Sequence, residues 1–292
     1  MKKWFSVLSF TLLLSLFLIS CESGTETKKF EASTSTDSGI VSQWKLGAQM
    51  WTFHTYTFLT ALEKVDSAGL RFIEAFQGQP LGGDFKDTFG LSMSADSKTK
   101  IKTLLAQKGI KLVAMGVIAP STVEEWKKNF EFAKEMGLEY ITAEPRKEHL
   151  DTINSMAGEY KILIAIHDHP KPNQYANPDS VLNAIKGRIN LGACADIGHW
   201  ARNGLDVVDC LKKLEGRIYG VHLKDIQKFD DVHSADTTLG NGVLKMPEIF
   251  NEFKRQNFNG MFSMEHELHW ENNVPDVIYN REYFIKQVSA LK

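Results

Sequence analysis

The chain has 292 residues, 43% of them hydrophobic, and carries a formal net charge of −2. This length fits one α/β barrel or two smaller domains, and the hydrophobic content can fill one large core. Because the chain is nearly neutral and has no block of Lys or Arg, it lacks the positive surface that binds phosphate backbones, and we expect no nucleic-acid partner.

Residues 1–20 have the features of a bacterial export signal. Two lysines follow Met1, and a mostly apolar run ends at the small residue Ser20. The run is too short to count as a structural membrane span. The four residues that end at Cys21 resemble the lipobox of bacterial lipoproteins, whose cysteine becomes the lipidated first residue of the mature chain. We therefore expect an exported protein with a lipid anchor at Cys21 in a bacterial membrane, facing the periplasm; the alternative is an ordinary signal peptide with a chance cysteine.

A polar segment follows the signal. Residues 22–42 are rich in Ser, Thr, Lys and Glu and show no apolar periodicity, which is typical of a flexible tether. The expected organisation is a signal over 1–20, a lipidated cysteine and linker over 21–43, and one folded domain over 44–292. Cys194 and Cys210 could form a disulfide in an oxidising compartment, but two buried thiols are the preferred interpretation.

From Trp44 onward, short apolar runs alternate with amphipathic segments. Strands are expected at 46–51, 72–76, 110–115, 138–143, 162–166, 189–195, 218–223 and directly after Gly260. The helix before a strand is expected to end at a glycine, at Gly69, Gly109, Gly137, Gly158, Gly187 and Gly216. Eight such units predict parallel strands with right-handed crossovers, and hence a single (β/α)8 barrel. A doubly wound open sheet is the alternative, but residues 47–51 lack its phosphate-binding glycine motif.

Two helices have further signals. Residues 121–124 read as a capping box, followed by an apolar stripe of Val123, Trp126, Phe130 and Ala133. A last helix is expected over 279–288.

In a barrel of this kind, function lies at the C-terminal ends of the strands. Alternation in the stretch 191–199 places Cys194 and Asp196 on one face, and His199 returns to the same rim after a turn. An Asp and a His at one strand end suit a divalent cation. The alternative is an Asp that caps the next helix and an unrelated surface His.

Other strand ends also carry charged or imidazole groups. They are Glu74, Glu144, His167 with His169, His222 with Lys224, and Glu265 with Glu267. Charged groups inside a closed barrel are costly unless they are paired or bind a metal. Asp196, His222 and Glu265 end three successive strands and predict one shared ion. For Glu74, His169 or Glu267 alone, a rim salt bridge or a satisfied core histidine is the alternative.

Four motifs together carry a resemblance: Asp-Ile-Gly-His over 196–199, Val-His-Leu-Lys-Asp over 221–225, Gly-Asn-Gly over 240–242, and Met-Glu over 264–265. They resemble the xylose isomerase-like TIM-barrel superfamily, in particular its sugar phosphate isomerase/epimerase group, from Trp44 to the C-terminus. That group includes ketose 3-epimerases, inosose dehydratases and, more distantly, endonuclease IV. An endonuclease of that type would need further histidines where Glu74 and Met115 stand.

The resemblance implies a divalent metal (Mn, Mg, Co or Zn) held by residues of four consecutive strands. Asp196, His222 and Glu265 match three of the family's ligands. The family's first ligand, a Glu, falls where this chain has His167, so either His167 or Glu144 completes the site. Because the missing Glu is also one of the epimerases' two acid/base residues, dehydratase or lyase chemistry is an open alternative. The resemblance also implies that His199 contacts the substrate.

The resulting hypothesis is a metal-dependent isomerase or epimerase for a keto-sugar or keto-glycoside. The ion would hold a carbonyl and a hydroxyl oxygen, Glu265 or Glu144 would remove the proton between them, and Lys224 or His199 would stabilise the metal-bound enediolate or return a proton. A dehydratase or lyase would use the same intermediate, and a carbohydrate-binding lipoprotein is the non-catalytic alternative.

The remaining substrate-binding candidates are Trp51, Glu74, His169 and Trp200, in addition to His199. Aromatic rings at Trp51 and Trp200, together with Phe53 and Phe76, suit stacking on sugar faces. Export favours a free sugar or glycoside over a sugar phosphate. The oligomeric state is not predicted.

Overall fold

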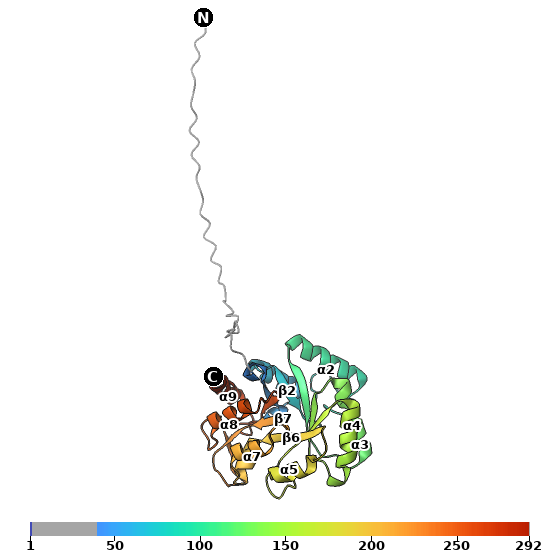
Figure 1. The fold of residues 1–292 in the computed structure, drawn as a ribbon. Coiled ribbons are helices and arrows are strands. Elements are labelled where there is room, and N and C mark those ends of the chain that lie inside the picture. Colours follow the sequence, from blue (N-terminus) through green and yellow to red (C-terminus); the bar gives the residue numbers. More distant parts are fainter. Residues whose placement is uncertain (2–39, 292) are drawn as a thin grey trace. The chain divides into compact units, whose positions relative to one another are not determined.

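Parallel strands close into a barrel, as expected. The computed structural model describes Met1 and residues 40–291, so the predicted Cys21 anchor and nearly all of the signal and linker lie outside the described residues. The barrel strands are β1 (Lys45–Gln49), β2 (Phe72–Ala75), β3 (Lys111–Ile118), β4 (Tyr140–Ala143), β5 (Leu163–Ile166), β6 (Leu191–Asp196), β7 (Ile218–Leu223) and β10 (Met261–Met264). Their order is β1-β10-β7-β6-β5-β4-β3-β2, and β1 pairs in parallel with both β10 and β2. The predicted (β/α)8 barrel is confirmed (Figure 1).

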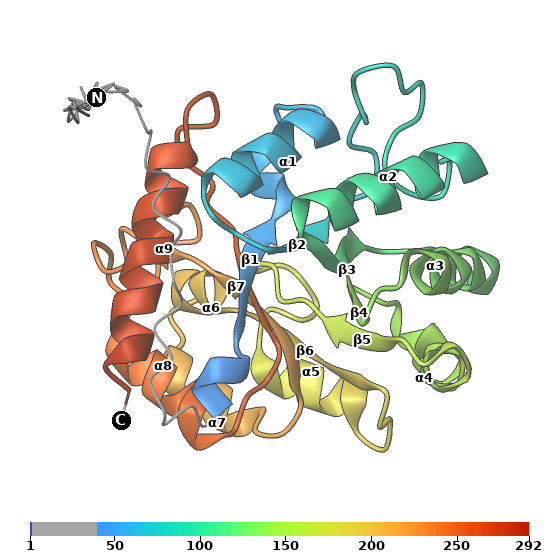
Figure 2. The same ribbon diagram turned by 90° about the horizontal axis from the view of Figure 1, so that it is seen from above.

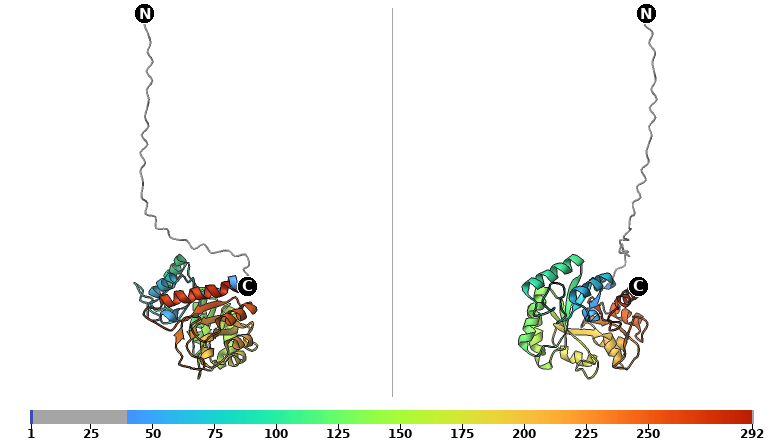
Figure 3. Two further views of the ribbon diagram at one scale, coloured as in Figure 1. Left: turned by 90° about the vertical axis from the view of Figure 1, so that its left-hand side faces the viewer. Right: turned by 180° about the vertical axis from the view of Figure 1, so that it is seen from behind.

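Helices surround the barrel, as the view from above shows (Figure 2) and two further views confirm (Figure 3). They are α1 (Phe58–Ser67), α2 (Ala95–Lys108), α3 (Val123–Met136), α4 (Leu150–Tyr160), α5 (Pro178–Ile185), α6 (Ile197–Arg202), α7 (Val207–Lys213), α8 (Met246–Arg255) and α9 (Val274–Ser289). Short 3-10 turns (Ile40–Gln43, Met50–Phe53 and Lys147–His149) and a hairpin of β8 (Asp225–Ile226) with β9 (Asp236–Thr237) complete the fold. Within the described part of the chain, no helix has the length and hydropathy needed to cross a bilayer.

The hydrophobic core has two parts. The larger part includes Phe58, Trp126, Phe130 and Phe262, all fully buried. A smaller cluster, which contains Val113, Ala114, Tyr140, Ala165, Cys194 and Met261, comes from strands of the barrel itself. Cys194 and Cys210 are both buried and unpaired, in agreement with the preferred interpretation.

Glycine ends several helices, with one exception. Gly109 and Gly137 cap α2 and α3 in the left-handed conformation, with φ of 62° and 77°. The prediction that Gly158 ends a helix is wrong, because Gly158 lies inside α4 and Lys161 is the left-handed cap, with φ of 58°. Lys161 precedes Ile162 directly, so the strand signal is correct although the cap is not a glycine.

The left-handed caps Gly137 and Lys161 allow a stability test. Gly137→Ala is expected to lower the free energy of unfolding by about 1 kcal/mol, because a β-carbon is unfavourable in the left-handed region. Lys161→Gly is expected to raise it slightly, since the same strain is removed there at some cost in chain entropy. Urea denaturation of both variants measures the difference, and equal shifts in one direction would contradict the assignment.

Three local predictions need correction. The capping box is formed by Thr122 and Glu125, one residue later than expected, and the side chain of Glu125 also accepts hydrogen bonds from Ser121. Val123, expected in the apolar stripe, is 36% exposed because it lies in the first turn of α3. The last helix starts at Val274 rather than 279, since Pro275 is accommodated in its first turn.

Candidate metal centre and active site

Asp196 uses its two carboxylate oxygens differently. It ends β6, and its Oδ1 accepts a hydrogen bond of 2.9 Å from the backbone N–H of His199, which caps α6. Its Oδ2 is buried and accepts no well-aligned hydrogen bond from the described residues, but it lies 3.0 Å from the ammonium group of Lys224. The helix-cap alternative is therefore correct for one oxygen, and the other oxygen belongs to a buried group of charged side chains.

Four buried side chains converge around that oxygen. His167, Asp196, His222 and Glu265 each offer one ligand atom, and these atoms lie within 4.8 Å of one another. They come from the C-terminal ends of β5, β6, β7 and β10, which are consecutive neighbours in the barrel. The structure thus brings the three family-matched residues together, with His167 rather than Glu144 as the fourth member.

Carboxylates orient both imidazole rings of this cluster. Nε2 of His222 lies 3.2 Å from Glu74 Oε1, and Nδ1 of His167 lies 3.3 Å from Glu144 Oε1. An ionised carboxylate can only accept, so these ring nitrogens carry the hydrogens. Their other nitrogens, Nε2 of His167 and Nδ1 of His222, are 3.1 Å apart, and Nδ1 of His222 also lies 3.1 Å from Glu265 Oε2.

This arrangement fits a divalent metal. The two ring nitrogens and the carboxylate oxygens of Asp196 and Glu265 lie close enough together to share one cation. Two imidazole nitrogens and two carboxylates are a common ligand set for divalent transition metals, and carboxylates behind metal-bound histidines are the usual second layer of such sites. His167, Asp196, His222 and Glu265 would hold the ion.

Asp196 and Glu265 are held in their ionised forms. Burial alone would raise the pKa of both carboxyl groups, but the charge of Lys224 and the neighbouring histidines lower both pKa values well below the ordinary range. The ammonium group of Lys224 lies 3.0 Å from Asp196 Oδ2, 2.8 Å from Glu265 Oε2 and 3.0 Å from Glu267 Oε1. Lys224 therefore balances the negative charge of the site.

The role of Glu74 behind His222 gives a prediction. Burial alone would raise the pKa of Glu74. The opposite effect of His222 and Ser263 is larger, so the pKa lies below its ordinary value and the group is anionic. Glu74→Gln removes this charge without touching a ligand, and it is expected to weaken metal binding about 10- to 100-fold, as loss of such partners usually does. Titration of the metal-free protein with Zn²⁺ measures the change. Unaltered affinity would show that Glu74 does not support the site.

A cavity of about 360 Å³ opens next to the cluster. Its walls are formed by Gln49, Trp51, Phe76, Gln77, Gly116, Val117, His167, His169, His199, Glu265 and Glu267. Five of the predicted site residues, Trp51, His167, His169, His199 and Glu265, are among them. The predicted residues Glu74, Glu144, Asp196, His222, Lys224 and Trp200 are not.

Two predicted substrate contacts are therefore corrected. Trp200 is fully buried in the hydrophobic core, as is Phe53, so neither ring can stack on a sugar. Glu74 is also fully buried, and its Oε2 accepts a hydrogen bond of 2.6 Å from Ser263. Glu74 supports His222 instead of contacting a substrate.

Two predicted acid/base roles are corrected as well. Glu144 accepts hydrogen bonds from His167 and His169 and, at 2.7 Å, from Asn173. Both of its oxygens are engaged, and it does not line the cavity, so it is not placed to remove a substrate proton. Lys224 has a side chain with no exposed surface and three carboxylate partners, so it is not placed to return one.

His169 is exposed to the cavity and held by Glu144. Burial raises the pKa of Glu144, but the hydrogen bonds from His167 and His169 lower it well below its ordinary value. The Nδ1–H of His169 therefore donates to an anion, and its Nε2 is the free nitrogen. One ring nitrogen of each of His167, His169 and His199 lies within 4.8 Å of the other two.

His199 has a partner that sequence reasoning missed. Burial lowers the pKa of His199 well below its ordinary value, so the ring is neutral. Lys224, His167 and Arg202 act in the same direction, and the negative charge of Asp196 acts against it. Arg202 Nη1 lies 2.9 Å from His199 Nδ1. The spacing of three residues within one helical segment was the available signal, because it places two side chains on the same face.

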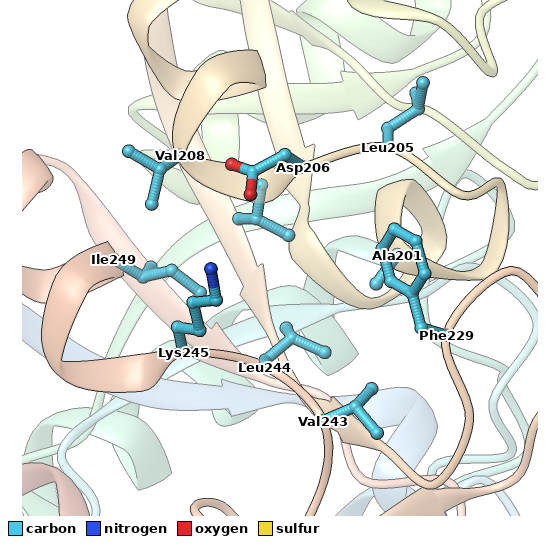
Figure 4. A pocket seen from close by; sticks show the side chains of 10 residues that line it. Ala201, Leu205, Asp206, Val208, Phe229, Val243, Leu244, Lys245 and Ile249 are labelled. Carbon is cyan, nitrogen blue, oxygen red and sulfur yellow. The ribbon is translucent and has the colours of Figure 1, made fainter.

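A second cavity, of about 290 Å³, contains none of the predicted residues (Figure 4). Its walls are mainly apolar side chains, with Asp206 and Lys245 as the charged ones. They come from α6, α7, α8, the segments before α7 and α8, and the loop between β8 and β9. Nothing in its lining resembles a ligand set, so the candidate site is the cavity beside the four-residue cluster.

Comparisons with known proteins identify the family and the fold. A family profile described as "Xylose isomerase-like TIM barrel" matches residues 62–287. An uncharacterized protein from Parabacteroides distasonis is 38% identical, with a TM-score of 0.70 over 84% of this chain and 99% of that one. A D-tagatose 3-epimerase-like protein is 20% identical (TM-score 0.66; 85% and 98% covered).

The probable 3-DHS dehydratase AsbF from Bacillus anthracis is 15% identical, with a TM-score of 0.67 over 82% of this chain and 98% of that one. At these two lower identities the similarity establishes the fold alone. A search among curated proteins finds no match. On the family profile and the residues it covers, the chain belongs to the xylose isomerase-like TIM-barrel family.

Proposed function

We propose that this protein is a metal-dependent isomerase or epimerase that removes the proton next to the carbonyl group of a keto-sugar or keto-glycoside. The observation that carries the proposal is the pairing of His169 with Glu144 at the wall of a cavity that is also lined by His167 and Glu265 of the four-residue cluster. A bound divalent ion would polarise the carbonyl oxygen and so make the neighbouring C–H more acidic.

His169 is the base in this proposal. Glu144 fixes the hydrogen on Nδ1, so the lone pair of Nε2 is available to take a proton from carbon. The imidazolium that forms is stabilised by the adjacent anion, as in other carboxylate–histidine pairs. Glu265 is a weaker candidate than expected, because it is held by Lys224 and belongs to the metal cluster.

The cavity lining supports a sugar rather than a sugar phosphate as substrate. Of the described residues in the lining, none is Lys or Arg, and Glu265 and Glu267 are acidic. An anionic phosphate would find no positive partner there. Trp51 is 41% exposed and contacts Phe76 edge-on, with ring centroids 5.1 Å apart, which gives the cavity an apolar wall suited to a sugar face. The exported location that we infer for the protein agrees with such a substrate.

A lyase is the second candidate, and one observation favours it. His169 and His199 follow neighbouring strands, β5 and β6, and their ring centroids are 5.3 Å apart. Base and proton donor therefore lie on one wall of the cavity. A β-elimination can use both on one face of the substrate, whereas an epimerase must deliver a proton to the opposite face.

Proton exchange in heavy water tests the proposal. Metal-loaded protein is incubated with a panel of keto-sugars and keto-glycosides, and NMR follows deuterium entry next to the carbonyl. An isomer or epimer that carries deuterium supports the first candidate, and an unsaturated sugar with release of the leaving group supports the lyase. Sugar binding that persists after chelation, without exchange or product, would instead indicate a carbohydrate-binding protein and reject both.

A further inference from the structure

Arg202 contacts Nδ1 of His199, whereas Nε2 of the same ring lies 3.4 Å from Asp196 Oδ2 in the four-residue cluster. Its Nη1 lies 2.9 Å from His199 Nδ1, its Nε donates to the carbonyl oxygen of Ser234 at 3.0 Å, and its Nη2 donates to Asp236 Oδ1 at 2.5 Å. Arg202 and Asp236 are buried, with 8% and 1% of their surfaces exposed. The guanidinium group is thus fixed in place by three partners.

This contact determines where His199 carries its hydrogen. A guanidinium group is always protonated in proteins and has no acceptor atom, so it can only donate. Nδ1 of His199 must then present its lone pair to Arg202, and the hydrogen of the neutral ring must be on Nε2. Placing a hydrogen on Nδ1 would set two N–H groups against each other.

The hydrogen on Nε2 has no hydrogen-bond acceptor among the described residues. Asp196 Oδ2 lies 3.4 Å from Nε2 but accepts no well-aligned hydrogen bond from it. His199 also lines the cavity. The Nε2–H group is therefore available to an oxygen atom of a bound molecule.

We propose that Arg202 is a positioning residue that holds His199 in the Nε2–H form, so that His199 donates a hydrogen bond to the substrate oxygen that gains negative charge when the proton leaves carbon. The second half of this inference rests on the proposed function. His169 and His199 are then held in opposite forms, one with a free lone pair and one with a free N–H, which assigns base and donor to different rings. His199 does not act as the base.

Asp236, which holds Arg202, also contacts a residue of the cavity lining. Asp236 Oδ2 accepts a hydrogen bond of 2.8 Å from the backbone N–H of Glu267, which lies in the cavity lining. Asp236 belongs to β9 of the small hairpin. The hairpin thus anchors the guanidinium group, and the placement of His199 depends on residues distant in sequence.

The first experiment measures the hydrogen position directly. Zinc-loaded protein labelled with nitrogen-15 in its histidines is studied by long-range proton–nitrogen NMR from about pH 6 to pH 8, the range in which free histidine titrates. The His199 signals are assigned by their loss in His199→Gln. We expect a protonated Nε2 and an unprotonated Nδ1 throughout. A hydrogen on Nδ1, alone or together with one on Nε2, would overturn the inference without reference to activity.

Variants of Arg202 test the consequence. Arg202→Met should leave His199 in a mixture of both forms and lower kcat about 10-fold or more with little change in KM, because the lost group orients a transition-state donor. Arg202→Lys keeps a donor-only cation and should restore the Nε2–H form and part of kcat. If Arg202→Met keeps both the NMR signature and kcat, the positioning role is rejected.

Failure of the inference and failure of the proposed function remain distinguishable. If the wild-type protein shows the Nε2–H form but exchanges no proton in any keto-sugar, the proposed function fails and the Arg202 assignment stands. If the protein exchanges protons and His199→Gln does so at the wild-type rate, the donor role fails and the proposed function stands. Circular dichroism and zinc content verify that each variant is folded.

Discussion

Replacing His169 by Gln is expected to lower kcat about 10²- to 10⁴-fold, the range that a positioned general base contributes, while metal content stays unchanged. The reason is structural: His169 lines the cavity and is held by Glu144, but it is not a member of the His167, Asp196, His222 and Glu265 cluster. Gln retains a polar group of similar size but cannot accept the proton. Steady-state kinetics with metal analysis of the same preparation measures both quantities.

The control for this variant is His233→Gln. His233 is exposed and lies outside the cavity lining, so its replacement is expected to leave kcat at the wild-type value. An H169Q protein that turns over normally would remove His169 from the mechanism and return the role of base to Glu265.

Replacing Glu265 by Gln is expected to abolish turnover by a different route. Glu265 supplies one of the two carboxylates of the cluster and one of the partners of Lys224. Its loss should weaken metal binding by at least about 100-fold, more than the loss of a supporting residue behind a ligand. Zinc titration of the metal-free protein measures the affinity, and unfolding in urea with excess chelator verifies that the fold is retained.

Glu248→Gln on the exposed face of α8 is the matched control and should bind the metal as the wild type does. If E265Q binds the ion with full affinity, the four-residue cluster is not the metal site. Together, the two variants separate chemistry from metal binding, since H169Q is expected to keep the ion and E265Q to lose it.

Most of the barrel could be predicted from sequence because its signals are local. A glycine that caps a helix and the apolar run that follows it lie within a few residues, as at Gly137 and β4. The exception at Lys161 shows the limit, since a non-glycine residue can adopt the same backbone conformation when the surrounding fold holds it there. Lengths of helices were less predictable, as the early start of α9 shows.

Alternation along a strand predicts whether a side chain points into or out of the barrel, but not how deeply that side chain is buried. The sequence places His222 and Lys224 at one strand end, but it could not show that Lys224 is enclosed by three carboxylates. Glu74 shares this inward direction and lies behind His222. Depth depends on strand tilt and register, which are properties of the closed sheet.

The choice between His167 and Glu144 also required the structure. Both residues follow neighbouring strands, and the role of Glu144 is set by His169 and Asn173, which approach it from a different part of the chain. Arg202 was missed because a basic residue in the last turn of a helix usually serves only the helix end. Its contact with Asp236 makes it part of the site.

The cavity is divided between the two halves of the barrel. The histidines and glutamates of its lining come from the ends of β5, β6 and β10, whereas Gln49, Trp51, Phe76, Gln77, Gly116 and Val117 come from the ends of β1, β2 and β3. In the mechanism that we propose, the groups that handle protons and the groups that contact the rest of the substrate therefore lie on separate stretches of the sequence. Randomising the first third of the folded domain is expected to change substrate selectivity while His169, His199 and Glu265 are left as they are.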